Sequence, residues 1–243
     1  MKIFRRVRKH LLKNKRIRNY FFYAIGEIIL VVVGILLALQ INTWNENRKK
    51  ERLRDNYVKA LVTDLKEDVS ALRHRLDYEE EKLAELTAFQ KRLSHPDATV
   101  DTLVKIARYE LDPYIQPNFS FSNSTYTALI ATGDIDLLDR ELTESLNELN
   151  KYQKETNQTM EWASQLYQTY IGAYSMNYSM NLPTTTIKKG SLSKDIWQNS
   201  KPKELAAQFN GVTGLKTNQH IVSTNSLTEV LELTREILEE VEE

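Results

Sequence analysis

One carboxylate stands inside the most apolar stretch of the sequence. Glu27 is the single charged residue within residues 21–39, whose other side chains are aliphatic, aromatic or glycine. A carboxylate in a membrane is costly and usually marks a function. Gly26, Gly34 and Ala38 accompany it, and small residues let two membrane helices approach closely. We therefore expect these four residues to make contacts within a membrane. The alternatives are that Glu27 snorkels to the headgroups, is protonated, pairs with Arg16 or Arg18, or handles an ion or a proton.

A second candidate is a group of tyrosines spaced three or four residues apart: Tyr167, Tyr170, Tyr174 and Tyr178, with two methionines nearby. Tyrosine offers a large, rigid contact area with a polar tip. This composition suits a pocket for a small ligand or a peptide. The alternative is that the tyrosines cap one end of a helical bundle.

Metal chemistry finds little support. The chain has no cysteine, which excludes thiolate zinc sites and cysteine nucleophiles. The four histidines, His10, His74, His95 and His220, do not have the spacing of metal ligands. We expect them to be solvated or to cap helices, and we expect no metal site.

Catalytic motifs are equally weak. The glycines in Gly211–Thr217 are too close together for a phosphate-binding loop, and glycine and lysine are not adjacent. Neither GxSxG nor a catalytic Ser-x-x-Lys context stands out. The acidic runs Glu79–Glu81 and Glu239–Glu240 are typical of solvated helix faces. We expect no catalytic residue, no cofactor and no enzymatic activity.

The apolar stretch is long enough to cross a membrane. A hydrocarbon core of about 30 Å takes roughly 20 helical residues, and residues 20–42 satisfy that length with aromatic residues at both ends. The stretch is longer than the apolar region of a cleaved signal peptide, which has about 7–15 residues. We predict an uncleaved signal anchor with three parts: a basic segment 1–19, a transmembrane helix 20–42 and a helical domain 43–243.

Charge predicts the orientation. Nine Lys and Arg residues precede the stretch and five follow it closely, which favours a cytoplasmic N-terminus. Residues 1–54 carry fourteen basic and three acidic side chains, a net charge of +11, and residues 55–243 carry the compensating −11. We therefore expect the large C-terminal domain to lie outside the cytoplasmic membrane. The basic segment would contact anionic headgroups, not nucleic acid.

The rest of the chain has the periodicity of long helices. Apolar residues from Val58 to Leu93 follow a 4-3 alternation that breaks at Glu79 and Gln90, and residues 142–174 repeat it. Strand signals are nearly absent. We predict an all-α chain in which the transmembrane helix continues as a stalk helix into an antiparallel helical bundle. A coiled coil between copies of the chain is the alternative.

Shorter elements are placed by capping and breaking residues. We expect a helix over residues 97–111 capped by Asp97, and a brief helix that is capped by Ser122 or Ser124 and ends at Gly133. We predict a loop over residues 179–201. We expect a last helix that begins at Pro202 and is weakened by Gly211 and Gly214.

Two blocks of the sequence resemble a known family. Residues Tyr23 to Lys50 read YAIGEIILVVVGILLALQINTWNENRKK, and Thr125 to Leu146 read TYTALIATGDIDLLDRELTESL. Both are similar to blocks of an uncharacterised single-pass membrane protein family of Bacteroidota, labelled a domain of unknown function. The resemblance implies a bacterial inner-membrane location and a helical extramembrane region, which the predicted orientation places in the periplasm, but it implies no activity.

These observations favour a membrane-anchored, non-enzymatic scaffold, sensor or partner-binding protein. The alternative is an ancillary subunit of a transporter or secretion complex that works through the membrane helix and Glu27. We expect a membrane-protein partner or a homo-oligomer in either case.

Overall fold

The computed structural model describes residues 15–116 and 118–242 and contains no strand within them. The predicted basic segment falls largely on residues 1–14, outside the described residues. The all-α prediction is confirmed. The elements in chain order are α2 (Lys15–Leu93), α3 (Val100–Lys105), the π-helix η1 (Ile106–Glu110), α4 (Ser124–Thr132), the 3-10 helix η2 (Asp134–Leu137), α5 (Arg140–Asn177), α6 (Ser191–Gln198) and α7 (Pro202–Glu242).

The chain divides into two compact units, Met1–Asn56 and Tyr57–Glu243, and α2 contributes residues to both. From residue 19 onwards, the helix of the first unit exposes all of its apolar side chains except the half-buried Ala24. By length and composition, this part of α2 could cross a membrane. The predicted limits of the membrane helix, residues 20–42, stay a prediction.

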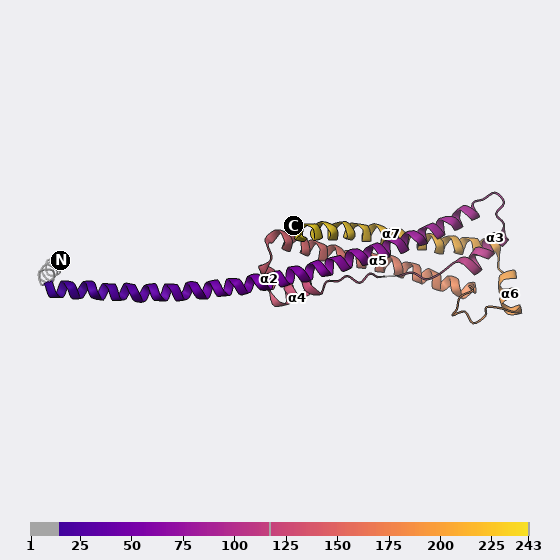
Figure 1. Ribbon diagram of the computed structural model, residues 1–243. Helices are drawn as coiled ribbons and strands as arrows, with labels where there is room; N and C mark the ends of the chain where they lie inside the picture. The colour runs from indigo at the N-terminus through magenta and orange to yellow at the C-terminus, as the bar shows by residue number, and fades with distance from the viewer. Residues whose placement is uncertain (1–14, 117, 243) are drawn as a thin grey trace, which may run out of the picture. The chain divides into compact units, whose positions relative to one another are not determined.

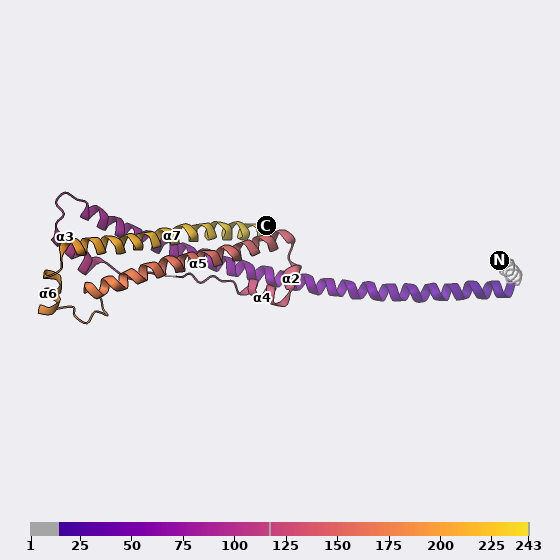
Figure 2. The same cartoon turned by 180° about the vertical axis from the view of Figure 1, so that it is seen from behind.

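Three long helices make up the second unit: the part of α2 from Tyr57 onwards, α5 and α7, which lie side by side in both views (Figures 1 and 2). Ion pairs from Lys66 to Glu242 and from Glu79 to His220 show that α7 runs antiparallel to α2. In contrast, α2 and α5 run in the same direction (Figure 1). This is possible because residues 111–116 and 118–123, here called the return segment, lead the chain back along the bundle.

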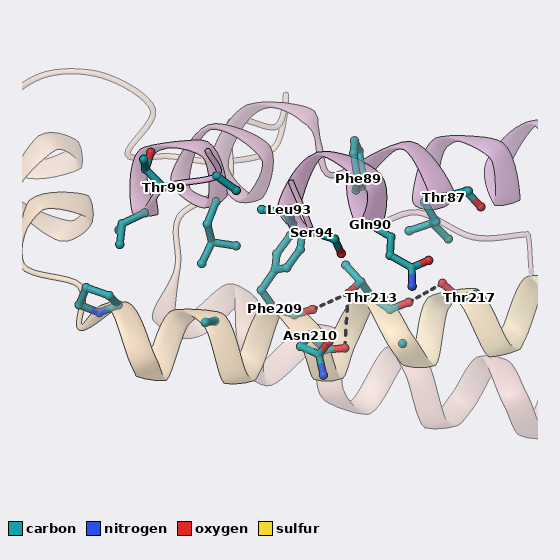
Figure 3. Close-up of a pocket in the computed structure, with 17 residues that line it drawn as sticks. Thr87, Phe89, Gln90, Leu93, Ser94, Thr99, Phe209, Asn210, Thr213 and Thr217 are labelled. Atoms are coloured by element: carbon teal, nitrogen blue, oxygen red, sulfur yellow. Dashed lines mark hydrogen bonds between the residues drawn. The ribbon is translucent and has the colours of Figure 1, made fainter. Parts of the chain in front are cut away.

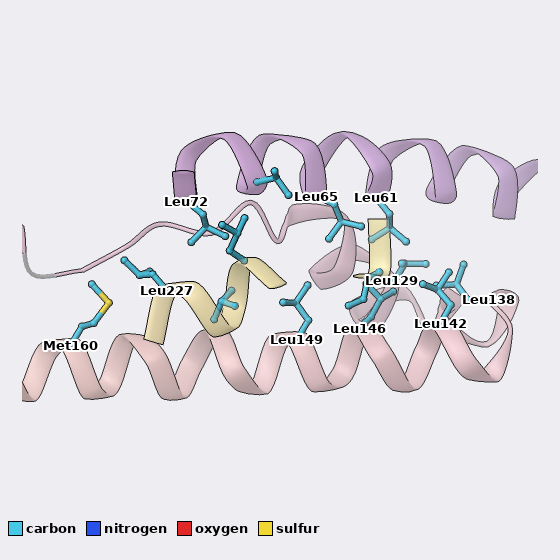
Figure 4. Close-up of a cluster of buried hydrophobic side chains, with 14 residues drawn as sticks. Leu61, Leu65, Leu72, Leu129, Leu138, Leu142, Leu146, Leu149, Met160 and Leu227 are labelled. Carbon is cyan, nitrogen blue, oxygen red and sulfur yellow. The ribbon is translucent and has the colours of Figure 1, made fainter. Parts of the chain in front are cut away.

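A leucine-rich core joins these helices at the end near α4 (Figure 4). Leu65, Val69 and Leu72 are buried in it, as the 4-3 pattern predicts, but Leu61 takes the inward place expected for Val62. Its fourteen buried members are Leu61, Leu65, Val69, Leu72, Leu129, Leu138, Leu142, Leu146, Leu149, Met160, Leu227, Val230, Leu231 and Ile237.

A second core fills the other end of the bundle. It joins α3 and η1 to the last turns of α5, to α6 and to the start of α7. Tyr178 lies at its centre, with ring centroids 5.0 Å from Tyr174 and 5.9 Å from Trp197. The two cores are therefore separate, and the middle of the bundle must be filled in another way.

Several predicted helix ends are wrong for local reasons. Thr99, not Asp97, caps α3 through a capping box with Thr102, because the chain turns at Ser94–Asp97 first. Neither Ser122 nor Ser124 caps α4. Asp64 of α2 accepts a hydrogen bond from the Thr125 N–H instead, at 2.9 Å.

Other boundaries match or extend the predictions. Gly133 ends α4 in the left-handed conformation, with φ of 76°, as expected of a C-terminal glycine. Residues 179–201 are not a plain loop, because they contain α6. Helix α7 begins at Pro202 as predicted and continues without a break through Gly211 and Gly214.

Candidate functional site

A groove runs between the end of α2, α3 and the first half of α7 (Figure 3). Its volume is about 720 Å³, within the range of small-molecule sites. The residues that line it are Leu86, Thr87, Phe89, Gln90, Leu93, Ser94, Ala98, Thr99, Val100, Leu103, Pro202, Ala206, Phe209, Asn210, Thr213, Gly214 and Thr217.

None of these seventeen residues is ionisable. On α7, the hydroxyl of Thr213 donates to the carbonyl of Phe209 at 2.8 Å, and the hydroxyl of Thr217 donates to the carbonyl of Thr213 at 2.9 Å (Figure 3). These hydroxyls keep lone pairs free to accept hydrogen bonds. The lining of the groove therefore offers apolar surface together with hydroxyl groups that can accept hydrogen bonds.

Between the two cores lies a layer of buried polar side chains, which we call the polar layer: Arg75 and Glu79 of α2 with Lys216, Gln219, His220 and Ser223 of α7. Arg75 Nε donates to Glu79 Oε1 at 2.6 Å, and His220 Nδ1 lies 2.5 Å from Glu79 Oε2. Glu79 is thus held between a guanidinium and an imidazole, which offsets part of the cost of burying its charge.

The polar layer also fixes the return segment. Arg75 donates to the backbone carbonyls of Gln116 and Asn118, and Lys216 donates to the carbonyl of Asp112. From α5, the Tyr167 hydroxyl donates to the carbonyl of Pro113 at 2.8 Å. Side chains from all three long helices therefore satisfy backbone groups that a segment without secondary structure would otherwise leave unpaired.

Burial shifts the pKa values of one group in the polar layer and of two tyrosines beside it. Desolvation lowers the pKa of the Lys216 ammonium, because burial disfavours the charged form. The same effect raises the pKa of the Tyr167 phenol, and it raises that of Tyr78 with help from the Glu79 carboxylate. Glu79 and His220 are completely buried, so a solute cannot reach them in this conformation.

The expectation of solvated side chains at Glu79 and His220 is wrong. Their positions continue the helical spacing of the inward faces, Leu72–Arg75–Glu79 on α2 and Lys216–His220–Ser223 on α7. A pattern that counts only apolar residues misses Glu79 and His220. Helical spacing alone, whatever the residue type, would have placed both on the inward faces. His74 and His95 are exposed, as predicted.

The four candidate tyrosines do not share one environment. Tyr174 and Tyr178 pack against each other in the second core, whereas Tyr167 is buried and bonded to the return segment. Tyr170 is 54% exposed, and Ile171 takes the inward place that the 4-3 pattern assigns to it. A separate cavity beside this part of α5 contains none of the four in its lining. A ligand role for them stays a prediction.

The membrane candidates lie in the first unit. Glu27, Gly26, Gly34 and Ala38 are all exposed on the described helix. No atom lies within 4 Å of a Cβ added at Gly26 or Gly34. Space for a second helix therefore exists beside both glycines, and contacts within a membrane stay a prediction.

Metal ligands do not gather in the part of the chain that the structure describes. Within residues 15–116 and 118–242, no three His, Asp or Glu side chains form a group suited to a metal ion. The candidate functional features are therefore the groove, the polar layer and the exposed apolar helix.

Comparison with known proteins gives one match. Residues 27–207 match the model of a family of unknown function, DUF6090. No curated protein and no solved structure matches the chain significantly. The match covers most of the second unit and much of the apolar helix, so the expected resemblance to an uncharacterised family holds, while the bacterial group and the sequence motif stay predictions. The chain belongs to the family of unknown function DUF6090.

Proposed function

We propose that this protein is anchored in a membrane by one helix and acts by non-covalent binding, as a scaffold, sensor or partner-binding protein. The N-terminus would be cytoplasmic and the second unit periplasmic, at the inner membrane of a bacterium. Nine basic residues before the apolar stretch against five after it support this orientation.

One observation carries the proposal. The second unit buries most of its leucines, chiefly in two cores, whereas the first unit leaves a long run of large apolar side chains uncovered. Leu30 is 74% exposed and Ile28 is 63% exposed. Water solvates such a surface poorly, and lipid chains would cover it on every side.

The groove supplies a binding function for the second unit. Its mixture of apolar side chains and hydroxyls, without an ionisable group, suits a neutral molecule or a short uncharged peptide. It lies far along the chain from the apolar helix and within one compact unit. We infer that the groove binds its ligand without forming or breaking a covalent bond.

A second candidate function is that of an ancillary subunit in a transporter or secretion complex. The observation that favours it is Glu27, an exposed carboxylate within the apolar part of α2, beside uncrowded glycines. A pure anchor gains nothing from such a residue. In this version the membrane helix itself would contact the partner.

Topology and anchoring can be tested together. Alkaline phosphatase, which is active only outside the cytoplasm, is fused after Glu243 and membranes are washed with alkaline carbonate. We expect an active fusion that resists extraction. An inactive but abundant fusion would show that the C-terminus lies in the cytoplasm, contrary to the proposal. Release of the fusion by carbonate would show that the helix does not anchor the protein in the membrane.

A further inference from the structure

The helix carries a dense group of cations just after its apolar stretch. Arg48, Lys49, Lys50, Arg52 and Arg54, here called the collar, lie within seven residues, and all five are exposed. They begin about 10 Å beyond Ile41 and end about 20 Å beyond it, at 1.5 Å per residue. If the apolar stretch spans the membrane, as proposed above, the collar lies in the water just outside the headgroup layer, which is about 5–8 Å thick on each side.

The cations surround the helix. At about 3.6 residues per turn, Arg48 and Arg52 lie on one side, Lys49 on the next, and Lys50 with Arg54 across from them. A protein that docks on a helix meets one face of it, whereas lipid headgroups surround a helix that crosses their layer. The distribution around the helix therefore fits headgroups better than it fits an acidic protein.

Neighbouring groups leave the collar available. Two acids, Glu46 and Glu51, lie before and within the collar. Glu46 accepts a hydrogen bond from Asn42 at 3.0 Å. Every ion pair among the described residues lies between residues 57 and 243. Arg48 lies over the Trp44 ring, 5.6 Å from its centroid, an arrangement suited to the interface, where tryptophan is enriched.

We propose that the collar binds the headgroups of anionic phospholipids in the leaflet from which α2 emerges. Long Lys and Arg side chains can reach back towards the headgroups while their stems lie along the helix. Anionic lipids attract such residues over about one Debye length, near 8 Å in physiological salt. The inference rests on the proposed membrane anchor and adds a lipid preference to it.

Native mass spectrometry of the full chain tests this. The protein is purified in mild detergent, stripped of lipid, and offered phosphatidylglycerol or phosphatidylcholine. The test variant changes the five collar residues: Arg48→Gln, Lys49→Gln, Lys50→Gln, Arg52→Gln and Arg54→Gln. The matched control removes five exposed cations of the second unit: Arg73→Gln, Lys91→Gln, Lys154→Gln, Lys189→Gln and Lys203→Gln. All chains keep the basic N-terminus, so differences report the collar.

We expect the parent and the control to retain phosphatidylglycerol over phosphatidylcholine, and the collar variant to lose at least about half of that preference. An unchanged preference in the collar variant, or an equal loss in the control, overturns the inference. Carbonate extraction separates the two proposals. If the parent chain is released, the anchor and the collar both fail, whereas retention with an unchanged lipid preference refutes the collar alone.

Discussion

Glu79 of α2 and His220 of α7 are 141 positions apart in the sequence, yet their side chains meet at 2.5 Å in the buried middle of the bundle. Arg75 completes the contact from one turn before Glu79. Because both leucine-rich and aromatic cores end on either side of this layer, it fixes which turn of α7 faces which turn of α2. A shift by one turn would leave these charges without partners.

The first prediction concerns Glu79. Glu79→Ala should destabilise the second unit by about 3–5 kcal/mol, because it leaves the buried Arg75 guanidinium without its counter-charge. Chemical unfolding of the full chain in detergent, followed by circular dichroism, measures the change. The neighbouring Glu80 is exposed, so Glu80→Ala should change the unfolding free energy by less than about 0.5 kcal/mol. Equal effects of the two changes would mean that the polar layer does not stabilise the bundle.

The second prediction concerns pH. Burial lowers the pKa of Lys216 below its unfolded value of 10.5. Between those two pKa values the unfolded chain binds more protons, so Lys216 makes stability rise as pH increases towards 10.5, and stability is lost as pH falls through the folded pKa. Lys216→Met should remove this slope, and the exposed Lys203→Met should keep it. Unfolding free energies at several alkaline pH values provide the test. The prediction is contradicted if Lys216→Met and the parent show the same pH slope.

Two glycines should respond in opposite directions to the same change. Gly214 lies within α7 and a Cβ added there meets no atom within 4 Å, so Gly214→Ala should stabilise the helix by about 0.5–1 kcal/mol. Gly133 has a φ of 76°, which L-residues rarely adopt, so Gly133→Ala should destabilise by about 1 kcal/mol. Melting temperatures of both variants measure this. A loss of stability in Gly214→Ala would show that the groove side of α7 is more crowded than described.

Sequence periodicity predicted α5 best. Nine of the ten positions expected to face inwards between Leu142 and Tyr174 are buried, including the polar Gln153 and Thr156, and Tyr170 is the exception. The spacing identified these positions because the register of one helix depends on local sequence alone. An apolar pattern is less informative for α7, because polar side chains fill the middle of its buried face.

The site was harder to predict than the helices. The groove takes residues from α2, α3 and α7, and its threonines carry no motif. His220, which contacts Glu79, is distant from it in sequence. Lys216 is equally distant from the Asp112 carbonyl that it contacts, and that carbonyl belongs to the return segment, which side chains of three helices hold in place. Local propensity contains no information about such contacts, so they appear only when the helices pack.

The last prediction concerns Glu27. If the membrane helix pairs with another helix, the carboxylate can face a donor there, and the open space beside Gly26 and Gly34 permits the close approach that pairing requires. An unpaired carboxylate costs about 2.5–3.5 kcal/mol at the centre of a membrane helix and less near the interface. Glu27→Leu removes both charge and hydrogen bonding, whereas Glu27→Gln keeps the shape and the hydrogen bonds. We expect cross-linking between helices in native membranes to fall in Glu27→Leu, and to fall in Glu27→Gln only if the charge itself is recognised. Ile28→Leu on the same exposed stretch is the control. If both Glu27 variants insert and cross-link as the parent does, Glu27 is merely tolerated, because a carboxylate that no helix contacts loses nothing when it is replaced.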